Sequence, residues 1–278
     1  EMLKRMGAFK EIEREEIHKL DHLEEAHAAA LNDRTAPWRE ELRKAMKPKE
    51  RTAIARVKMN ELDPEYRSHT RLEEVNQGLT AEQARTEASR CLDCANPTCM
   101  TGCPVGINIP SFIKNIERGE FLEAAKVLKE TSALPAVCGH EAVAIGYLER
   151  FAADYERESG QISLPEVALP NGIKVAVIGS GPAGLSFAGD MAKLGYEVTV
   201  FEALHEIGGV LKYGIPEFRL PNKIVDVEIE NLSKLGVTFV KDCIVGKTIS
   251  VEDLKADGFQ GIFVASGAGL PNFMNIPG

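Results

Sequence analysis

The sequence predicts an α-helical domain followed by an α/β domain of the Rossmann-like type. Three observations support this order: helical apolar periodicity fills the first half, a cysteine-rich run at 91–103 interrupts it, and an apolar strand at 175–178 leads into a glycine-rich loop. A length of 278 residues allows about two domains. The polar segment 156–172 carries proline and glycine, so we place the boundary near residue 166, which gives domains at 1–165 and 166–278.

Composition restricts the class of protein. An apolar content of 44% and a charged content of 27% are those of a globular protein. A net charge of −9 argues against a nucleic-acid-binding surface. No apolar run approaches the ~18 residues of a membrane span, and the first residues lack the apolar core of a secretion signal. We therefore expect a cytoplasmic protein that binds neither nucleic acid nor membrane.

The first domain is expected to begin with short helices. Apolar residues recur at helical spacing over 1–31, which predicts a first helix. A second helix is expected over 38–46, and Pro48 prevents it from continuing. Asp63 and Pro64 suggest a turn in the mixed segment that follows.

A stronger helix signal precedes the cysteines. Thr80 and Gln83 form a capping box, and the helix that they start runs to about residue 90 and leads directly into the first cysteine. Further helices with an apolar side are expected over 109–116, 120–130 and 144–155.

Cys91, Cys94, Cys99 and Cys103 have the spacing C-x2-C-x4-C-x3-C-P. Short loops of this kind bring sulfur atoms close together, so three of them can surround one face of an iron–sulfur cube, and in two-cluster ferredoxins the cysteine before proline reaches the other cluster. A structural zinc site usually divides its ligands into two separated pairs. The single run therefore favours an iron–sulfur cluster over zinc, with disulfide bonds as a third alternative.

The second domain opens on a dinucleotide-binding pattern, a G-x-G-x-x-G loop between a strand and a helix. Gly179 permits the tight turn, Gly181 lets a pyrophosphate approach the backbone, and Gly184 lets the helix pack on the strand. The helix directs its free N–H groups at the phosphates. A second strand at 197–201 ends at Glu202, 18 positions after Gly184, where a carboxylate can accept hydrogen bonds from an adenosine ribose. Because a carboxylate repels a 2′-phosphate, this site is not expected to hold NADP(H).

The rest of the second domain continues the α/β pattern. The paired Gly208 and Gly209 again let the backbone approach a ligand closely. A helix is expected at about 223–235, and strands are expected at 237–241 and 261–265. Residues 250–253 start a short helix, and the isolated Cys243 is interpreted as a core thiol.

With these motifs assembled, the chain resembles the small (β) subunit of NADPH-dependent glutamate synthase over about residues 38–278. It also resembles two relatives of that family, the N-terminal region of dihydropyrimidine dehydrogenase and the large subunit of NADH-dependent ferredoxin:NADP oxidoreductases. The stretches that carry the resemblance are residues 87–94, 99–104, 109–113, 134–139, 148–151, 179–184 and 208–221.

The resemblance implies an electron-transfer flavoprotein, in which NADPH reduces FAD and two [4Fe-4S] clusters carry single electrons to a partner subunit. In the glutamate synthases the partner's FMN reduces 2-iminoglutarate to glutamate. The flavin supplies the hydride chemistry, so no catalytic side chain is expected. The implied cluster ligands are Cys91, Cys94, Cys99, Cys103 and Glu149. The implied FAD-binding residues are Gly179, Ser180, Gly181, Pro182, Ala183, Gly184, Glu202, Gly208, Gly209 and Val210.

Two departures from the family pattern matter. The family has a second cysteine group after the position of Cys138 and Gly139, whereas here residues 140–146 follow directly and leave both clusters short of ligands. Either that loop is not represented in this chain, which we favour, or it is lost and at most one cluster forms on the four cysteines. The family also continues past residue 278 with an NADPH domain, so we expect the chain to be a fragment of a longer enzyme with an incomplete FAD domain.

Two other functions remain open. The same electron-transfer module could serve a pyrimidine-reducing or ferredoxin-linked partner, because nothing in the chain binds the terminal substrate. Alternatively, the incomplete ligand set would fit a scaffold or regulatory subunit without clusters, which binds a large partner through its helical N-terminal part. An oligomer is compatible with either function.

Overall fold

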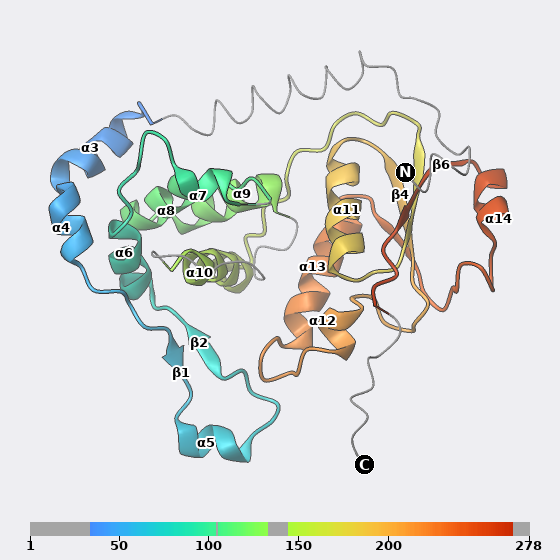
Figure 1. The fold of residues 1–278 in the computed structure, drawn as a ribbon, viewed down its shortest axis with the longest axis horizontal. Coiled ribbons are helices and arrows are strands. Elements are labelled where there is room, and N and C mark those ends of the chain that lie inside the picture. Colours follow the sequence, from blue (N-terminus) through green and yellow to red (C-terminus); the bar gives the residue numbers. More distant parts are fainter. Residues whose placement is uncertain (1–33, 104, 133–143, 269–278) are drawn as a thin grey trace.

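The computed structural model describes residues 34–103, 105–132 and 144–268, and these form a helical part beside an α/β part (Figure 1). The helix expected over 1–31 and the segment around Cys138 lie outside the described residues. In the regions that are described, no helix is long and apolar enough to cross a membrane.

The helical part is built on α6, α8, α9 and α10. Their apolar faces meet in one core that includes Phe112, Ile116, Leu128 and Leu148. The N-termini are set by local chemistry: the Thr80 side chain accepts a hydrogen bond from the Gln83 N–H in a capping box, as predicted. The helices span Pro37–Ala45 (α3), Pro48–Ala53 (α4), Pro64–His69 (α5), Ala81–Ser89 (α6), Thr98–Thr101 (α7), Ile109–Arg118 (α8), Phe121–Thr131 (α9) and Ile145–Ser159 (α10).

The helix expected over 38–46 is α3, which ends at Ala45, before Pro48, as predicted, but Pro48 also begins a further helix, α4, that was not expected. The turn expected at Asp63 and Pro64 is wrong, because Pro64 begins α5 and Asp63 is its N-cap. Proline has no N–H to donate and its fixed φ suits the first helical position, so it starts these helices. An arm made of β1 (Asn60–Glu61), α5 and the antiparallel β2 (Asn76–Gly78) projects from the helical part (Figure 1).

Within the described residues, the α/β part is a four-stranded parallel sheet in the order β5-β4-β3-β6. This confirms the Rossmann-like sheet that was predicted. Its first strand, β3, is an inner strand with β4 and β6 on either side. Two cores form: one joins Val177 and Val200 to α11 and α13, and the other joins Ala176 to Leu254 of α14 and to Cys243, which is the core thiol expected. The elements are β3 (Lys174–Ile178), α11 (Pro182–Lys193), β4 (Glu197–Phe201), α12 (Val210–Tyr213), α13 (Asn222–Lys234), β5 (Thr238–Val240), α14 (Val251–Ala256) and β6 (Phe259–Val264).

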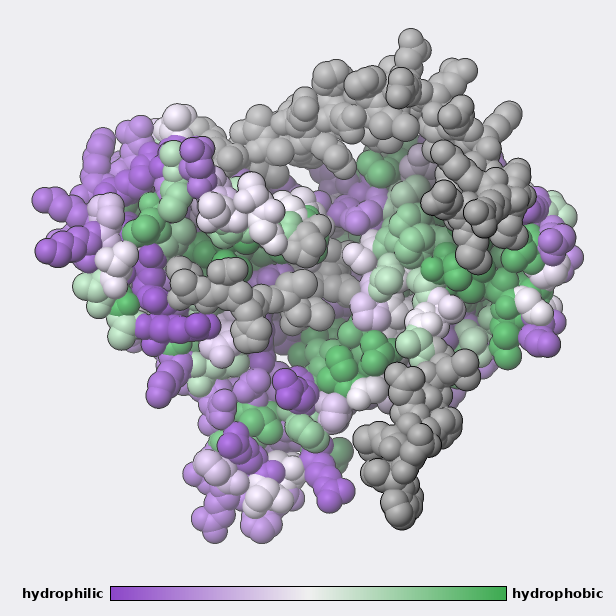
Figure 2. Space-filling model, viewed as in Figure 1, coloured by the Kyte–Doolittle hydropathy of each residue, from purple (hydrophilic) through white to green (hydrophobic). Residues whose placement is uncertain are grey.

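The two parts touch along α9 and α11 and again through the arm. The Lys193 ammonium of α11 donates to the Glu130 carbonyl of α9 at 3.1 Å. The Val75 N–H of the arm donates to the Phe218 carbonyl of the α/β part at 2.9 Å. On the face shown in Figure 2, hydrophilic side chains cover α3, α4 and α5, while apolar side chains gather over α12.

Candidate functional site

The four clustered cysteines lie at one end of the helical core. Cys91 follows α6 directly, Cys99 lies on α7, and both pack with Cys103 against the core. Cys94 is exposed. All five cysteines that the structure describes are free thiols, which is contrary to the disulfide alternative for these four.

Three of the thiols lie close enough to influence one another. Burial raises the pKa of the Cys99 thiol, and the charges of Cys91 and Cys94 raise it further. Burial also raises the pKa of Cys91, against the pull of the Lys114 ammonium. Such thiols become ligands only when a metal centre displaces their protons, because the thiolate is the ligand form.

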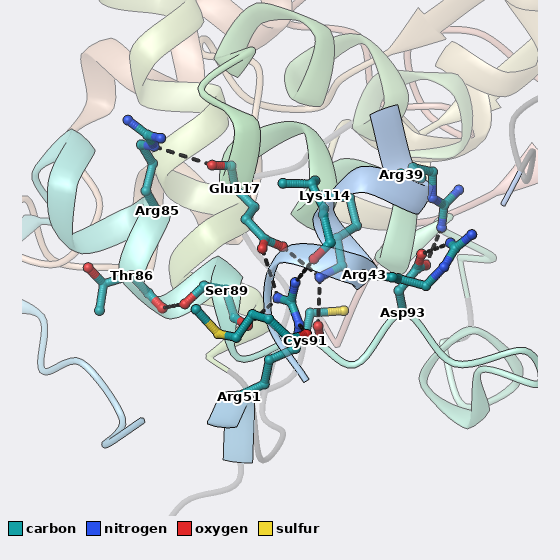
Figure 3. A network of polar contacts seen from close by, with 12 residues as sticks. Arg39, Arg43, Arg51, Arg85, Thr86, Ser89, Cys91, Asp93, Lys114 and Glu117 are labelled. Atoms are coloured by element: carbon teal, nitrogen blue, oxygen red, sulfur yellow. Dashed lines mark hydrogen bonds and ion pairs between the residues drawn. The ribbon is translucent and has the colours of Figure 1, made fainter. Parts of the chain in front are cut away.

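Buried cations hold the main chain that leads into the cysteines (Figure 3). The Arg51 guanidinium donates to the Ser89 carbonyl at 2.5 Å, and the Lys114 ammonium donates to the Cys91 carbonyl at 2.6 Å. Both cations also pair with Glu117, at 2.8 Å and 2.6 Å. The backbone before and at Cys91 is thus fixed from α4 and α8.

Asp93, between the first two cysteines, is an ion-pair centre. Its side chain is fully buried and pairs with Arg39 and Arg43 of α3 (Figure 3), and its carbonyl accepts a hydrogen bond from Arg34. These guanidinium groups hold the pKa of the Asp93 carboxyl below its usual value, against the effect of burial. The residue adopts φ 51°, a left-handed conformation that Asp tolerates better than most side chains.

Glu87 joins three segments of the helical part. Its buried carboxylate accepts hydrogen bonds from the Val57 N–H at 2.8 Å and the Ala144 N–H at 2.9 Å, and it pairs with Arg90. The carboxylate therefore fixes the end of α6, where the chain turns toward Cys91.

Glu149 is a buried carboxyl of α10 that the helical core does not satisfy. Its side-chain Oε1 has no hydrogen-bond partner among the described residues, and burial raises the pKa of the group to about 8. A buried polar atom without a partner is rare in proteins and requires an explanation. A metal or cluster ligand is one, so this observation fits the iron–sulfur set that the resemblance implies.

No group of three or more His, Cys, Asp or Glu side chains among the described residues is arranged to hold a single metal ion. The four ligands of an iron–sulfur cube surround four metal atoms, however, and stand farther apart than the ligands of a single ion. The free, mutually close thiols and the unsatisfied Glu149 therefore fit part of a cluster site, and Cys138 lies outside the described residues.

The glycine loop begins where β3 ends. Gly179 adopts φ 101°, and a Cβ there would lie 2.5 Å from the Ala265 carbonyl oxygen that follows β6. A Cβ on Gly184 would lie 2.0 Å from the Gly179 carbonyl oxygen, so the close approach of helix to loop requires glycine. A Cβ on Gly181 would meet nothing within 4 Å, which leaves that side of the loop open. Pro182 and Ala183 are the first residues of α11.

Glu202 is less free than the sequence suggested. The residue is 6% exposed, and its Oε2 accepts hydrogen bonds from both the N–H and the hydroxyl of Ser180. Its Oε1 accepts one from the Leu204 N–H at 2.9 Å. The carboxylate is therefore hydrogen-bonded to the glycine loop through Oε2, and Oε1 can accept one further hydrogen bond.

The paired glycines complete this edge of the sheet. The Gly208 N–H donates to the Ser180 hydroxyl at 2.9 Å, and a Cβ on Gly209 would lie 2.9 Å from the Cα of Gly181. Val210, the first residue of α12, is exposed beside them. The two glycine segments thus meet at the carboxyl ends of β3 and β4, where parallel α/β sheets bind their ligands.

Comparison with known proteins gives two separate matches along the chain. A family model for dihydropyrimidine dehydrogenase domain II, 4Fe-4S cluster, matches residues 67–141, and a model for an NAD(P)-binding Rossmann-like domain matches residues 177–234. The chain therefore contains an iron–sulfur domain followed by a Rossmann-like dinucleotide-binding domain, and it is related to oxidoreductases.

Curated relatives confirm the resemblance. The chain is 37% identical over 224 residues to the NAD-dependent dihydropyrimidine dehydrogenase subunit PreT of Escherichia coli K12, which covers 73% of this chain and 54% of that protein. It is 34% identical over 212 residues to the glutamate synthase [NADPH] small chain of the same strain, which covers 70% and 45%. The chain thus spans about half the length of these relatives.

Proposed function

Because the chain is a homologue of glutamate synthase small chains and PreT subunits over at least 70% of its length, we propose that it is the electron-transfer part of a longer oxidoreductase. It would pass electrons from NADPH through FAD and [4Fe-4S] clusters to a partner subunit. The observation that carries this proposal is the presence of both sites in one chain. The cysteines lie on the helical part, which matches a 4Fe-4S family, and the glycine loop lies at the edge of a Rossmann-like sheet.

The first domain, at about 1–165, would hold the clusters. Cys91, Cys94, Cys99, Cys103 and Glu149 are the ligands that this chain offers among its described residues. Arg51 and Lys114 hold the backbone carbonyls of Ser89 and Cys91 by hydrogen bonds. The main chain that carries the first thiol is therefore fixed.

The second domain, from about 166, would hold FAD, for which the support is the resemblance to flavoproteins. The N-terminus of α11 and the N–H groups after Gly179 would receive the pyrophosphate. Glu202 would accept from the ribose and exclude a 2′-phosphate, so NADPH is expected to bind elsewhere in the longer protein. The bound flavin would supply the exchange between a hydride and single electrons, while these residues hold and orient it.

The test is to purify the intact protein that carries this chain without oxygen and to identify its chromophores. We expect FAD, released by heat and identified by chromatography, together with iron and acid-labile sulfide and a broad visible absorbance that dithionite bleaches. A protein with neither FAD nor iron would overturn the proposal and favour the scaffold function.

The partner has two candidates. We favour a large glutamate synthase subunit, which would form glutamate from glutamine and 2-oxoglutarate. The PreT relatives, at 37% identity, favour a pyrimidine-reducing partner instead. Adding each large subunit to the reduced protein distinguishes them, because only one product, glutamate or a dihydropyrimidine, should form at the expense of NADPH or NADH.

A further inference from the structure

One hydroxyl group connects three parts of the dinucleotide site. The Ser180 side chain is fully buried, donates to Oε2 of Glu202 and accepts from the N–H of Gly208 at 2.9 Å. These contacts join the glycine loop after β3, the acidic end of β4 and the start of the second glycine segment. The hydroxyl uses its donor and one acceptor position on protein groups, so its role differs from direct contact with a ligand.

Ser180 determines how the Glu202 carboxylate is presented. Oε2 accepts from both the N–H of Ser180, at 2.9 Å, and its hydroxyl, whereas the one donor to Oε1 within the described part of the chain is the Leu204 N–H, at 2.9 Å. A carboxylate oxygen can accept about two hydrogen bonds, so the open position is on Oε1. Without the hydroxyl, Oε2 would be less engaged and the carboxylate could turn.

The same hydroxyl determines the spacing of the two glycine segments. Gly209 already lies against Gly181, since a Cβ on Gly209 would stand 2.9 Å from its Cα. The hydrogen bond from the neighbouring Gly208 to Ser180 holds the segments at this contact distance. Two backbone stretches that face a pyrophosphate are thus fixed relative to each other before any ligand arrives, and such preorganisation reduces the ordering cost of binding.

We propose that Ser180 is a positioning residue for dinucleotide binding, which acts through Glu202 and Gly208 and leaves Oε1 of Glu202 as the acceptor for the adenosine ribose. The inference rests on the proposed function only in using FAD as the ligand. It predicts that the effects of Ser180 and Glu202 on binding are not independent.

A double-mutant cycle in the intact protein tests this. The flavin-free forms of wild type, S180A, E202A and S180A/E202A are titrated with FAD, and folding is checked by circular dichroism. We expect S180A and E202A each to weaken FAD binding on the order of tenfold. The double variant should be weaker than E202A, because the contact to Gly208 is also lost, but it should stay well short of the roughly hundredfold loss that independent effects would give. S180T, which keeps the hydroxyl, should retain most of the affinity.

The matched control is S233A, because the Ser233 hydroxyl on α13 is exposed and bonds only within its own helix among the contacts described. Wild-type affinity in S180A, or losses that multiply fully in the double variant, would overturn the inference. If S180T does not fold, the cycle alone decides. If the wild type binds no FAD, the proposed cofactor is wrong, and the same cycle with NADH supports or overturns the role of Ser180 by the same criteria.

Discussion

At the scale of single residues, the charge on Asp93 is expected to matter most for stability. Removing one partner of a buried ion pair leaves the other charges without compensation and costs about 3 kcal/mol or more. Asp93→Asn keeps the shape and the tolerance of positive φ, but it leaves Arg39 and Arg43 facing a neutral group. We expect the free energy of unfolding, measured with denaturant, to fall by about 3 kcal/mol.

The control for this variant is Glu40→Gln. Glu40 pairs with Lys44 at 3.5 Å on the surface of α3, with side chains 47% and 78% exposed. A loss of less than about 1 kcal/mol is expected there. Equal losses in the two variants would show that burial of the Asp93 cluster contributes nothing.

Gly209→Ala should weaken ligand binding through a steric effect. Gly209 has φ 52°, and an added Cβ would lie 2.9 Å from the Cα of Gly181, so one glycine segment must move. We expect the affinity for FAD, measured by titration, to fall by at least about tenfold. Gly236→Ala is the control, because its φ is 99° but nothing lies within 4 Å of the new Cβ. It should cost about 1 kcal/mol of stability and leave binding unchanged; equal affinities in both variants would contradict the steric explanation.

The site residues that could be predicted from the sequence are those that a short, regular spacing in the chain identifies. The cysteine run and the glycine loop could be recognised because ligand spacing and the absence of a Cβ depend on neighbours in the chain. Asp93 and Lys114 were not identified, since the partners in their contacts to Arg39 and Cys91 lie 54 and 23 positions away in the chain. The only signal available was the presence of charged residues beside apolar ones in short helices.

At the scale of elements, the capping box of α6 is expected to position the first cysteine. The Thr80 hydroxyl accepts from the Gln83 N–H, and the Gln83 side chain accepts from the Thr80 N–H at 2.8 Å. Thr80→Ala should cost about 1 kcal/mol, because the N-terminal N–H groups of the helix lose an acceptor. For a chain of this size the melting temperature should fall by about 3 °C.

The control for Thr80→Ala is Thr52→Ala on the exposed side of α4. In the part of the chain that the structure describes, the Thr52 hydroxyl bonds only to the Lys49 carbonyl of its own turn. Calorimetry should show little change for that variant. A Thr80→Ala protein that melts with the wild type would show that tertiary packing alone holds α6.

Elements with strong local signals were predicted well, and short ones were not. The helices α6, α8 and α9 and the strand β4 begin and end close to the expected positions, because caps, glycines and apolar periodicity act locally. The arm strands β1 and β2 and the four-residue helices α7 and α12 were missed. Among the described residues, the arm strands pair only with each other and are held by a distant contact between Val75 and Phe218, and the two helices are single turns, too short to show an apolar period.

At the scale of the whole molecule, the joint between the two parts is expected to respond to pH. A cavity of about 30 Å³ lies there, lined by Lys129 and Ser163 on one side and by Glu228 and Asn231 of α13 on the other. Burial raises the pKa of Glu228 to about 6, with Lys129 opposing and Glu156 adding to the shift. The protonated form is thus the one that the folded joint prefers.

The sign of the pH effect follows from this shift. A raised pKa means that the stabilisation by protonated Glu228 is complete below its ordinary value of 4.5 and is lost as pH rises through about 6. Glu228→Gln should remove this part of the pH dependence, and it should be more stable than the wild type at pH 7 by about 1 kcal/mol, since the group is only half-buried. Thermal unfolding at pH 5 and pH 7 measures both, with Glu230→Gln on the same helix as control. Equal changes of melting temperature with pH in the wild type and Glu228→Gln would contradict the assignment of this pH dependence to Glu228.

The cationic side chains behind the cysteine run have a consequence for how the protein matures. The carbonyls of Ser89, Cys91 and Asp93, every second residue of one stretch, accept hydrogen bonds from Arg51, Lys114 and Arg34. None of these bonds involves a sulfur atom, so they do not depend on a metal, and we expect this stretch to keep its shape in the iron-free protein. Small zinc domains gain their structure from the metal itself. Here, by contrast, iron and sulfide would be delivered to a backbone that is already folded.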